Sequence, residues 1–206
     1  MFVAVPLAEP VRTVITELVE RVRARAPGSR PGSPPDVRPV RWVRTDGLHL
    51  TIRFLGPTPS ERFPALQTAI RRVAAQTPPL SVGLAGAGSF PRPDRPRTLW
   101  LGVSAGLPEL AELAHRLDAE LAAAGWASDP RPFRAHLTLA RSDGMRAGPE
   151  TLRLLVAEAA ALDERWTADR LMLYESVTGG GAARYEPLFE VPLLATPALR
   201  LPGSAD

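Results

Sequence analysis

The chain has 206 residues, 45% of them hydrophobic, which is enough to bury one sizeable core. It contains no cysteine, which excludes disulfides, zinc–thiolate sites, iron–sulfur clusters and cysteine nucleophiles. The formal net charge is +3, and every basic residue is an arginine, a side chain that pairs well with phosphate.

Composition and charge do not by themselves indicate a function. The sequence is also rich in Ala, Pro and Gly, which favours a coding bias as the source of the arginines. Residues 1–6 are apolar but carry no basic leader, so they do not resemble a secretory signal. No apolar run approaches the ~20 residues that a membrane span requires. We expect a cytoplasmic protein with no membrane partner.

The first half of the chain predicts alternating strands and helices. Residues 2–5 predict a buried strand, and the apolar spacing over 11–22 predicts a helix. A loop rich in Pro, Gly and Ser over 27–39 should be flexible. The alternating pattern of 48–55 predicts a strand, and 60–73 predicts the helix that follows it.

The second half repeats this alternation. Strands are predicted over 80–84, 98–103, 135–140, 166–176 and 184–194. Helices should begin at Pro108, ending at Gly125, and at Pro149. A loop is predicted over 86–96, the last two strands should pair around a turn at Gly179-Gly180-Gly181, and the tail from 196 should fray.

The two halves share one order of elements, which indicates an internal duplication. Each half reads strand, helix, strand with the tripeptide His-Leu-Thr, helix, strand. A duplication tends to relate equivalent residues by a pseudo-two-fold axis. Two equivalent histidines would then face a common cleft.

The two His-x-Thr tripeptides are the candidate active site. Side chains alternate along a strand, so His49 and Thr51 should project from one face, as should His136 and Thr138. Histidine has an ordinary pKa near 6.5, so two imidazoles can divide the acid and base roles of phosphodiester hydrolysis. The threonine hydroxyls can donate hydrogen bonds to the phosphate oxygens.

Other uses of these histidines are less well supported. A lone histidine in an apolar strand is usually structural, but two in corresponding positions favour a function. Zinc would need a third protein ligand, and neither motif offers one; no metal or cofactor is predicted. The third histidine, His115, lies on the polar side of its predicted helix and should face solvent.

Two longer segments carry a resemblance to a known family. The segments 49–56 (HLTIRFLG) and 131–141 (RPFRAHLTLAR) resemble the two signatures of the two-histidine phosphoesterase superfamily. The branch they resemble comprises the bacterial and archaeal RNA 2′,3′-cyclic phosphodiesterases, also called 2′-5′ RNA ligase-like proteins. The resemblance extends over nearly the whole chain, with 27–39 as an expanded loop.

The resemblance implies a fold, a reaction and a division of roles. The fold would be α+β and bilobal, one domain over 1–195, with two antiparallel sheets, outer helices and a central cleft, followed by a tail over 196–206. The reaction would be metal-independent hydrolysis of an RNA 2′,3′-cyclic phosphate to a 2′-phosphomonoester. His49 would be the proton donor to the leaving 3′ oxygen and His136 the proton acceptor from water.

Two arginines are candidates for binding the phosphate. Arg53 has the strand parity to join His49 and Thr51. Arg141 matches the arginine that closes the family's second signature, but strict alternation puts it on the face opposite His136. The strand must therefore end or bulge before Arg141 if that side chain is to reach substrate. Ala135 replaces the proline usual in that signature, and this removes no reactive group.

The sequence leaves two alternatives open. The same fold could bind RNA ends or nucleotides without turnover, or could act on a small cyclic-phosphate nucleotide. Ligation of RNA through a 2′-5′ bond would be reversal through the same two histidines. Phe90, beside several arginines, could stack on an RNA base, although core packing is the more usual role. No obligate protein partner is inferred.

Overall fold

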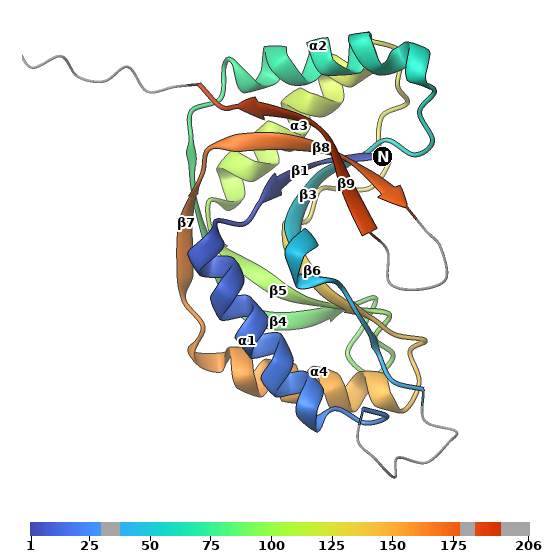
Figure 1. Cartoon of the computed structure of the whole chain (residues 1–206), viewed down its shortest axis with the longest axis vertical. Helices are drawn as coiled ribbons and strands as arrows, with labels where there is room; N and C mark the ends of the chain where they lie inside the picture. Colours follow the sequence, from blue (N-terminus) through green and yellow to red (C-terminus); the bar gives the residue numbers. More distant parts are fainter. Residues whose placement is uncertain (30–37, 178–183, 195–206) are drawn as a thin grey trace, which may run out of the picture.

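The computed structural model describes residues 1–29, 38–177 and 184–194 of the chain. Most of the loop predicted over 27–39 lies outside these residues, as do the predicted Gly179-Gly180-Gly181 turn and the tail over 196–206. Within the described residues the chain is a mixed α/β protein whose helices pack on the outside of a curled sheet (Figure 1).

The described helices and strands follow the predicted order. The α-helices are α1 (Glu9–Arg25), α2 (Phe63–Ala74), α3 (Leu107–Ala123) and α4 (Ala147–Glu158). The strands are β1 (Phe2–Pro6), β2 (Arg41–Trp42), β3 (His49–Phe54), β4 (Leu80–Phe90), β5 (Thr98–Ala105), β6 (His136–Arg141), β7 (Glu164–Ala168), β8 (Arg170–Val177) and β9 (Arg184–Pro192). The predicted helix end at Gly125 is confirmed, since this residue follows α3 with a φ of 87°.

Two strand predictions are wrong in their bounds. β4 continues to Phe90 instead of ending near residue 84, because irregular pairing around Gly86, with its φ of 65°, carries the strand past the glycines. The predicted strand over 166–176 is two strands, β7 and β8, which pair with different neighbours, β4 and β9. The first correction matters for the site, because it places Phe90 on a strand.

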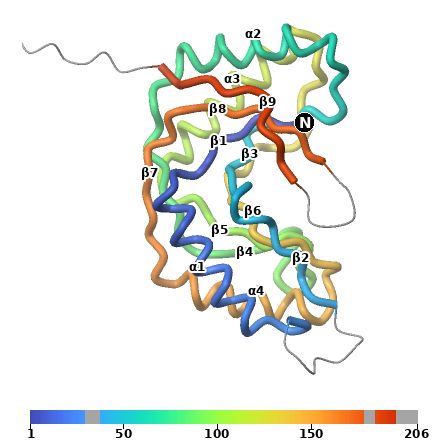
Figure 2. Tube along the Cα trace, viewed as in Figure 1, coloured from blue at the N-terminus to red at the C-terminus, as the bar shows by residue number. Residues whose placement is uncertain are grey.

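The described strands form one antiparallel sheet. Its order is β7-β4-β5-β6-β3-β1-β8-β9, and β2 pairs with β6 beside this path (Figure 2). The prediction of two separate sheets is therefore wrong. The halves are joined because β3 and β6 pair directly, at Leu50 and Leu137.

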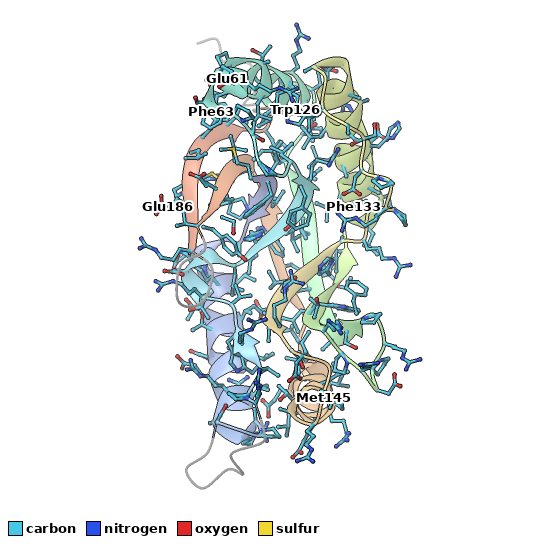
Figure 3. All side chains as sticks on the ribbon, turned by 90° about the vertical axis from the view of Figure 1, so that its right-hand side faces the viewer. Glu61, Phe63, Trp126, Phe133, Met145 and Glu186 are labelled. Atoms are coloured by element: carbon cyan, nitrogen blue, oxygen red, sulfur yellow. The ribbon has the colours of Figure 1, made fainter. Side chains whose placement is uncertain are left out.

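The helices divide into two pairs that cover different parts of the sheet. α2 and α3 pack against one another and against β3, β8 and β9, whereas α1 and α4 pack together against β4 and β7. The two helix pairs lie at opposite ends of the molecule, with Trp126 near one end and Met145 near the other (Figure 3). The buried apolar residues form one cluster that includes Leu50 and Leu137, so the joining strands belong to the core.

The strands β3 and β6 have the same local geometry. On β1, the partners of His49, Leu50, Thr51, Arg53 and Phe54 are Pro6, Val5, Ala4, Val3 and Phe2. On β5, the partners of His136, Leu137, Thr138, Ala140 and Arg141 are Gly102, Leu101, Trp100, Leu99 and Thr98. Both ladders skip the fourth residue of the strand, Ile52 or Leu139, which forms a β-bulge.

Candidate active site

The structure brings the two His-x-Thr motifs together on adjacent strands. β3 and β6 pair antiparallel at Leu50 and Leu137, and this register brings the His49 and Thr138 positions to one side of the pair and the Thr51 and His136 positions to the other. Because Leu50 and Leu137 point into the core, the four polar side chains point to the other face. Each histidine directly precedes the paired leucine of its strand, so in this antiparallel arrangement the two imidazoles lie on opposite sides of the Leu50–Leu137 pair. A phosphate bound between them would contact both rings.

Each imidazole is held by a backbone carbonyl two residues earlier in the chain. His49 Nδ1 lies 2.7 Å from the carbonyl oxygen of Gly47, and His136 Nδ1 lies 2.7 Å from that of Arg134. A carbonyl oxygen can only accept, so Nδ1 carries the proton in each neutral ring. Nε2 is then the reactive nitrogen, and no described group forms a hydrogen bond with it.

Aromatic rings surround His49. Phe2 stacks on the imidazole with ring centroids 4.6 Å apart, and Tyr174 stacks at 5.7 Å. Tyr185 approaches edge to face, with centroids 5.0 Å apart and an interplanar angle of 86°. These three rings come from β1, β8 and β9 and fix the plane of the imidazole from several directions.

His136 has an aromatic neighbourhood of its own. Phe90 meets it edge to face with centroids 5.0 Å apart, and the Trp100 ring lies at 6.4 Å. Phe90 also contacts Trp100 at 5.2 Å, and the Arg134 guanidinium lies 5.9 Å from the Phe90 ring centre. Phe90 is half-buried beside His136, so it forms a wall of the candidate site instead of packing in the core.

Burial lowers the pKa of both histidines. Loss of solvent lowers the pKa of His49 from 6.5 to about 4; the Gly47 carbonyl opposes this change and the charge of His136 adds to it. Burial also lowers the pKa of His136, with the Arg134 carbonyl opposing and the charge of Arg141 adding to the effect. Both rings are therefore neutral near pH 7.

The bulge at Leu139 decides where Arg141 points. The skipped residue reverses the alternation, so Arg141 lies on the face of Thr98 and Trp100, which is also the face of His136. Arg141 Nη1 donates to Thr98 Oγ1 at 2.6 Å. The condition set by the sequence, a bulge before Arg141, is met, and its guanidinium is within electrostatic range of His136.

The equivalent bulge at Ile52 has the reverse effect on Arg53. Arg53 is turned to the face of Val3, under α3, so its predicted parity is wrong. Its side chain is only 9% exposed, and Nε donates to Asp118 Oδ1 at 2.6 Å. The two terminal nitrogens donate to the carbonyl oxygens of Phe54 and Ala127. Arg53 thus bridges backbone segments and is already neutralised by a carboxylate.

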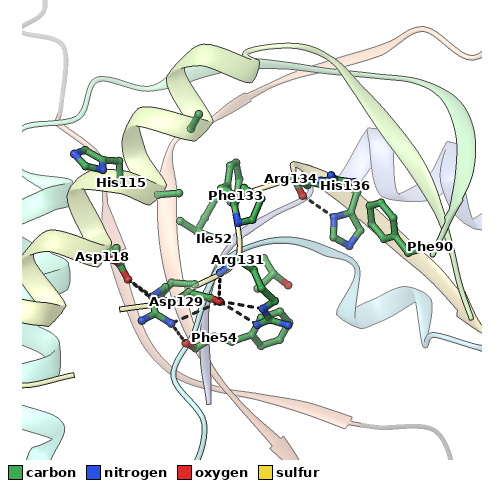
Figure 4. A pocket seen from close by; sticks show the side chains of 15 residues that line it. Ile52, Phe54, Phe90, His115, Asp118, Asp129, Arg131, Phe133, Arg134 and His136 are labelled. Carbon is green, nitrogen blue, oxygen red and sulfur yellow. Dashed lines mark hydrogen bonds and ion pairs between the residues drawn. The ribbon is translucent and has the colours of Figure 1, made fainter. Parts of the chain in front are cut away.

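A pocket of about 660 Å³ adjoins the two motifs (Figure 4). It lies beside Thr51 and His136 and extends to α3, where His115 is exposed at its edge, in agreement with the predicted solvent exposure. Its aromatic lining comes from Phe54, Phe90 and Phe133. The close-up shows Asp118 and the Arg131–Asp129 pair on the far side of the pocket from His136, and Asp118 is the carboxylate that pairs with Arg53. The two motifs thus border a pocket that is partly lined by aromatic side chains.

The part of the chain that the structure describes contains neither a cluster of metal-ligating side chains nor a helix that could cross a membrane. No group of three or more His, Asp or Glu side chains is arranged to hold a metal ion there. None of the described helices combines the length and the apolar character needed to cross a bilayer. The predicted absence of a metal and of a cofactor stays a prediction.

Several residues of the site were not predicted from the sequence. Tyr174 and Tyr185 come from strands far along the chain from His49, and Thr98 becomes a partner of Arg141 only through the β5–β6 ladder. No local motif marks these residues. The only available signal was the clustering of aromatic residues in predicted strands, and it does not tell which strand lies beside which.

The chain is similar to known proteins over most of its length. A family model described as the 2′-5′ RNA ligase superfamily matches residues 10–180. An RNA 2′,3′-cyclic phosphodiesterase of Aeropyrum pernix is 31% identical over 153 residues, which cover 74% of this chain and 86% of the relative. A protein of the same name from Geobacillus stearothermophilus is 32% identical over 200 residues, or 95% of this chain, and this chain spans 58% of it.

The fold is also similar to that of a solved structure. The crystal structure of E. coli LigT in complex with 3′-AMP superimposes with a TM-score of 0.67 and 28% sequence identity. The match covers 93% of this chain and 96% of the LigT chain. Sequence and structure therefore point to one family.

Proposed function

Because the chain belongs to the 2′-5′ RNA ligase superfamily, we propose that it hydrolyses RNA 2′,3′-cyclic phosphate ends to 2′-phosphomonoesters. The observation that carries the proposal is the matched pair of imidazoles. Each imidazole is held through Nδ1 by a backbone carbonyl, and its Nε2 forms no hydrogen bond with a described residue. The two histidines lie on either side of the Leu50–Leu137 pair. Acid–base catalysis of an in-line displacement needs such a pair.

The two histidines have opposite roles in the proposed reaction. His136 Nε2 accepts a proton from a water molecule as its oxygen attacks phosphorus. The bond from phosphorus to the 3′ oxygen breaks, and His49 donates a proton to that oxygen. The product carries a 2′-phosphate and a 3′-hydroxyl. Assignment of His49 as donor and His136 as acceptor follows the family resemblance of the two motifs.

Three further side chains stabilise the phosphate in this proposal. Thr51 and Thr138 lie beside the histidines and donate hydrogen bonds to the non-bridging oxygens. Arg141, oriented by Thr98, supplies a positive charge where negative charge develops in the transition state. Arg53 is assigned a structural role, because its donors are used by Asp118 and by backbone carbonyls.

The low pKa of His49 is consistent with a role as acid only once substrate is bound. A buried imidazole with a pKa of about 4 is neutral near pH 7. The negative charge of a bound phosphodiester favours the imidazolium and raises this pKa. The substrate thereby helps to protonate the group that expels its 3′ oxygen.

We also propose that the chain is one bilobal domain whose halves are related by a pseudo-two-fold axis. The identical partner register of β3 and β6, including the bulge at the fourth residue, supports this proposal. The carbonyl at position −2 from each histidine supports it further. A cytoplasmic location stays a prediction.

The experiment is turnover of adenosine 2′,3′-cyclic phosphate, and of an RNA oligonucleotide with the same end, in the presence of EDTA. The expected product is the 2′-phosphate, and both His49→Ala and His136→Ala should lower kcat by at least about 10²-fold. His115→Ala is the matched control and should keep full activity, since His115 is exposed on α3.

Other outcomes would lead to different conclusions. Loss of activity in EDTA would contradict the metal-independent mechanism. Full activity of either histidine variant would remove that residue from the mechanism. Tight binding of the cyclic phosphate without product would indicate a binding protein, and turnover of the mononucleotide alone would indicate a small-nucleotide substrate.

A further inference from the structure

Arg41 on β2 lies directly beside Arg141 in the sheet. The short strand β2 lies beside β6 (Figure 2), and Arg41 is the partner of Arg141 while Trp42 is the partner of Ala140. Partner residues in an antiparallel pair point to the same face, with their Cα atoms about 5 Å apart. Arg41 therefore shares the face of Arg141, Thr98 and His136.

The two arginines form a pair of like charges that nothing described neutralises. Arg141 donates to the neutral hydroxyl of Thr98, and Arg41 is exposed without a hydrogen bond or ion pair to any described residue. Like charges directly opposite on neighbouring strands are destabilising. An anion with at least two negative oxygens, or two adjacent anions, would relieve this repulsion.

The position of Arg41 separates it from the reaction centre. Arg141 is close enough to His136 to lower its pKa, whereas Arg41 is one strand further out and makes no such contribution. Among the described strands, β2 pairs only with β6, so Arg41 lies at an open edge of the sheet. A group bound by Arg41 would lie next to the phosphate bound by Arg141, on its solvent-exposed side.

We propose that Arg41 binds the phosphate on the 5′ side of the terminal nucleotide, the group that joins the cyclic-phosphate nucleotide to the rest of an RNA chain. The proposal rests on the proposed function and extends it, since it makes the enzyme favour substrates that carry this second phosphate. Arg141 and Arg41 then bind successive phosphates, and arginine suits both because its guanidinium is always charged and pairs bidentately with phosphate oxygens.

The experiment compares two substrates that differ only in the second phosphate. These are adenosine 2′,3′-cyclic phosphate with and without a 5′-phosphate. Arg41→Ala should lower kcat/KM about 10-fold for the substrate with the 5′-phosphate and change it less than about 2-fold for the other. Arg41→Lys should recover part of the loss, because it keeps the charge but not the bidentate geometry.

Arg44→Ala is the matched control. Arg44 lies on the same connecting segment and is exposed, but its guanidinium is already bound to Asp46, with Nη2 at 2.6 Å from Oδ2. This variant should preserve the ratio of the two kcat/KM values. Activity on the substrate without a 5′-phosphate also shows that each variant is folded.

Two results would overturn the proposal. If Arg41→Ala lowers activity on both substrates equally, Arg41 acts on the cyclic phosphate itself; if it lowers neither, Arg41 has no role in binding. Failure of the wild-type protein to hydrolyse either substrate is a different result, because it contradicts the proposed function and not the assignment of Arg41 alone.

Discussion

The ring of Tyr185 meets the imidazole of His49 edge to face, with the two ring centroids 5.0 Å apart. The same ring packs on Gly47, where a Cβ atom would come within 3.0 Å of Tyr185 Cδ2. Gly47 provides the carbonyl that holds His49 Nδ1. Tyr185 therefore contacts both partners of the hydrogen bond that orients the proposed acid.

Removal of the Tyr185 ring should reduce catalysis more than binding. Tyr185→Ala frees both His49 and the Gly47 carbonyl, and we expect kcat to fall about 10-fold or more with a small change in KM. Tyr185→Phe keeps the ring and should keep most of kcat. Steady-state kinetics on adenosine 2′,3′-cyclic phosphate tests both variants. Equal losses in the two variants would show that the hydroxyl, and not the ring, is the functional part.

Thr98 should act only through Arg141. Thr98→Val removes the hydroxyl that accepts from Arg141 Nη1 at 2.6 Å while keeping the shape of a buried side chain. We expect Arg141→Ala to lower kcat/KM by about 10²-fold and Thr98→Val by about 5-fold. In the Arg141→Ala background, Thr98→Val should have no further effect, as measured by a double-mutant cycle. Additive losses would mean that Thr98 acts independently.

The buried His49 should make the fold less stable in acid. Its pKa is about 4 in the folded state against 6.5 for the free side chain, so between these pH values the unfolded chain binds the extra proton. The free energy of unfolding should therefore fall as pH decreases from 6.5 to 4, by up to about 3 kcal/mol from this residue. Urea unfolding of wild type and His49→Gln across this range measures the contribution.

His49→Gln should flatten the pH dependence in that window, because Gln does not titrate. Carboxylates also titrate there, but they contribute to both proteins and cancel in the difference. If the two curves run parallel, the His49 imidazole is as easily protonated in the folded protein as in the unfolded chain.

Arg53 should contribute to stability and not directly to catalysis. Arg53→Met leaves Asp118 without its ion pair and the carbonyls of Phe54 and Ala127 without their donors. We expect a loss of about 2–3 kcal/mol in the free energy of unfolding, below the cost of a fully buried pair because Asp118 is 28% exposed. Urea denaturation measures this, with Arg44→Ala as an exposed control that should leave the free energy of unfolding unchanged.

The activity of Arg53→Met distinguishes the two roles considered for this residue. A structural role predicts that kcat/KM per folded molecule stays within about 3-fold of wild type. A much larger loss in a fully folded variant would restore Arg53 as a residue that binds the phosphate.

Most of the site was predictable, because the chemistry lies in two short motifs on strands. The spacing of His49 and Thr51, and of His136 and Thr138, sets which side chains share a face, and the structure places them on adjacent strands. Alternation also showed that Arg141 needed a bulge to reach the site. The sequence could not show that the bulge exists, since bulges depend on the partner strand.

The wrong predictions all concern features that depend on which strands lie side by side. The predicted strand parity of Arg53 was wrong because the bulge at Ile52 reverses it, and two sheets were expected because nothing local shows that β3 pairs with β6. The aromatic rings around His49 were missed for the same reason. Each of these features depends on contacts between segments far apart in the chain, which periodicity along one strand does not report.

The single pair that joins β3 to β6 has a mechanical consequence. Beyond Leu50 and Leu137 the two strands do not pair with each other, and His49, Thr51, His136 and Thr138 all border that point. The distance between the imidazoles therefore depends on how far the two strands diverge on either side of this pair. A phosphate that bonds to both strands would connect them where they do not pair. Substrate binding would then hold the two His-x-Thr motifs at a fixed spacing during the reaction.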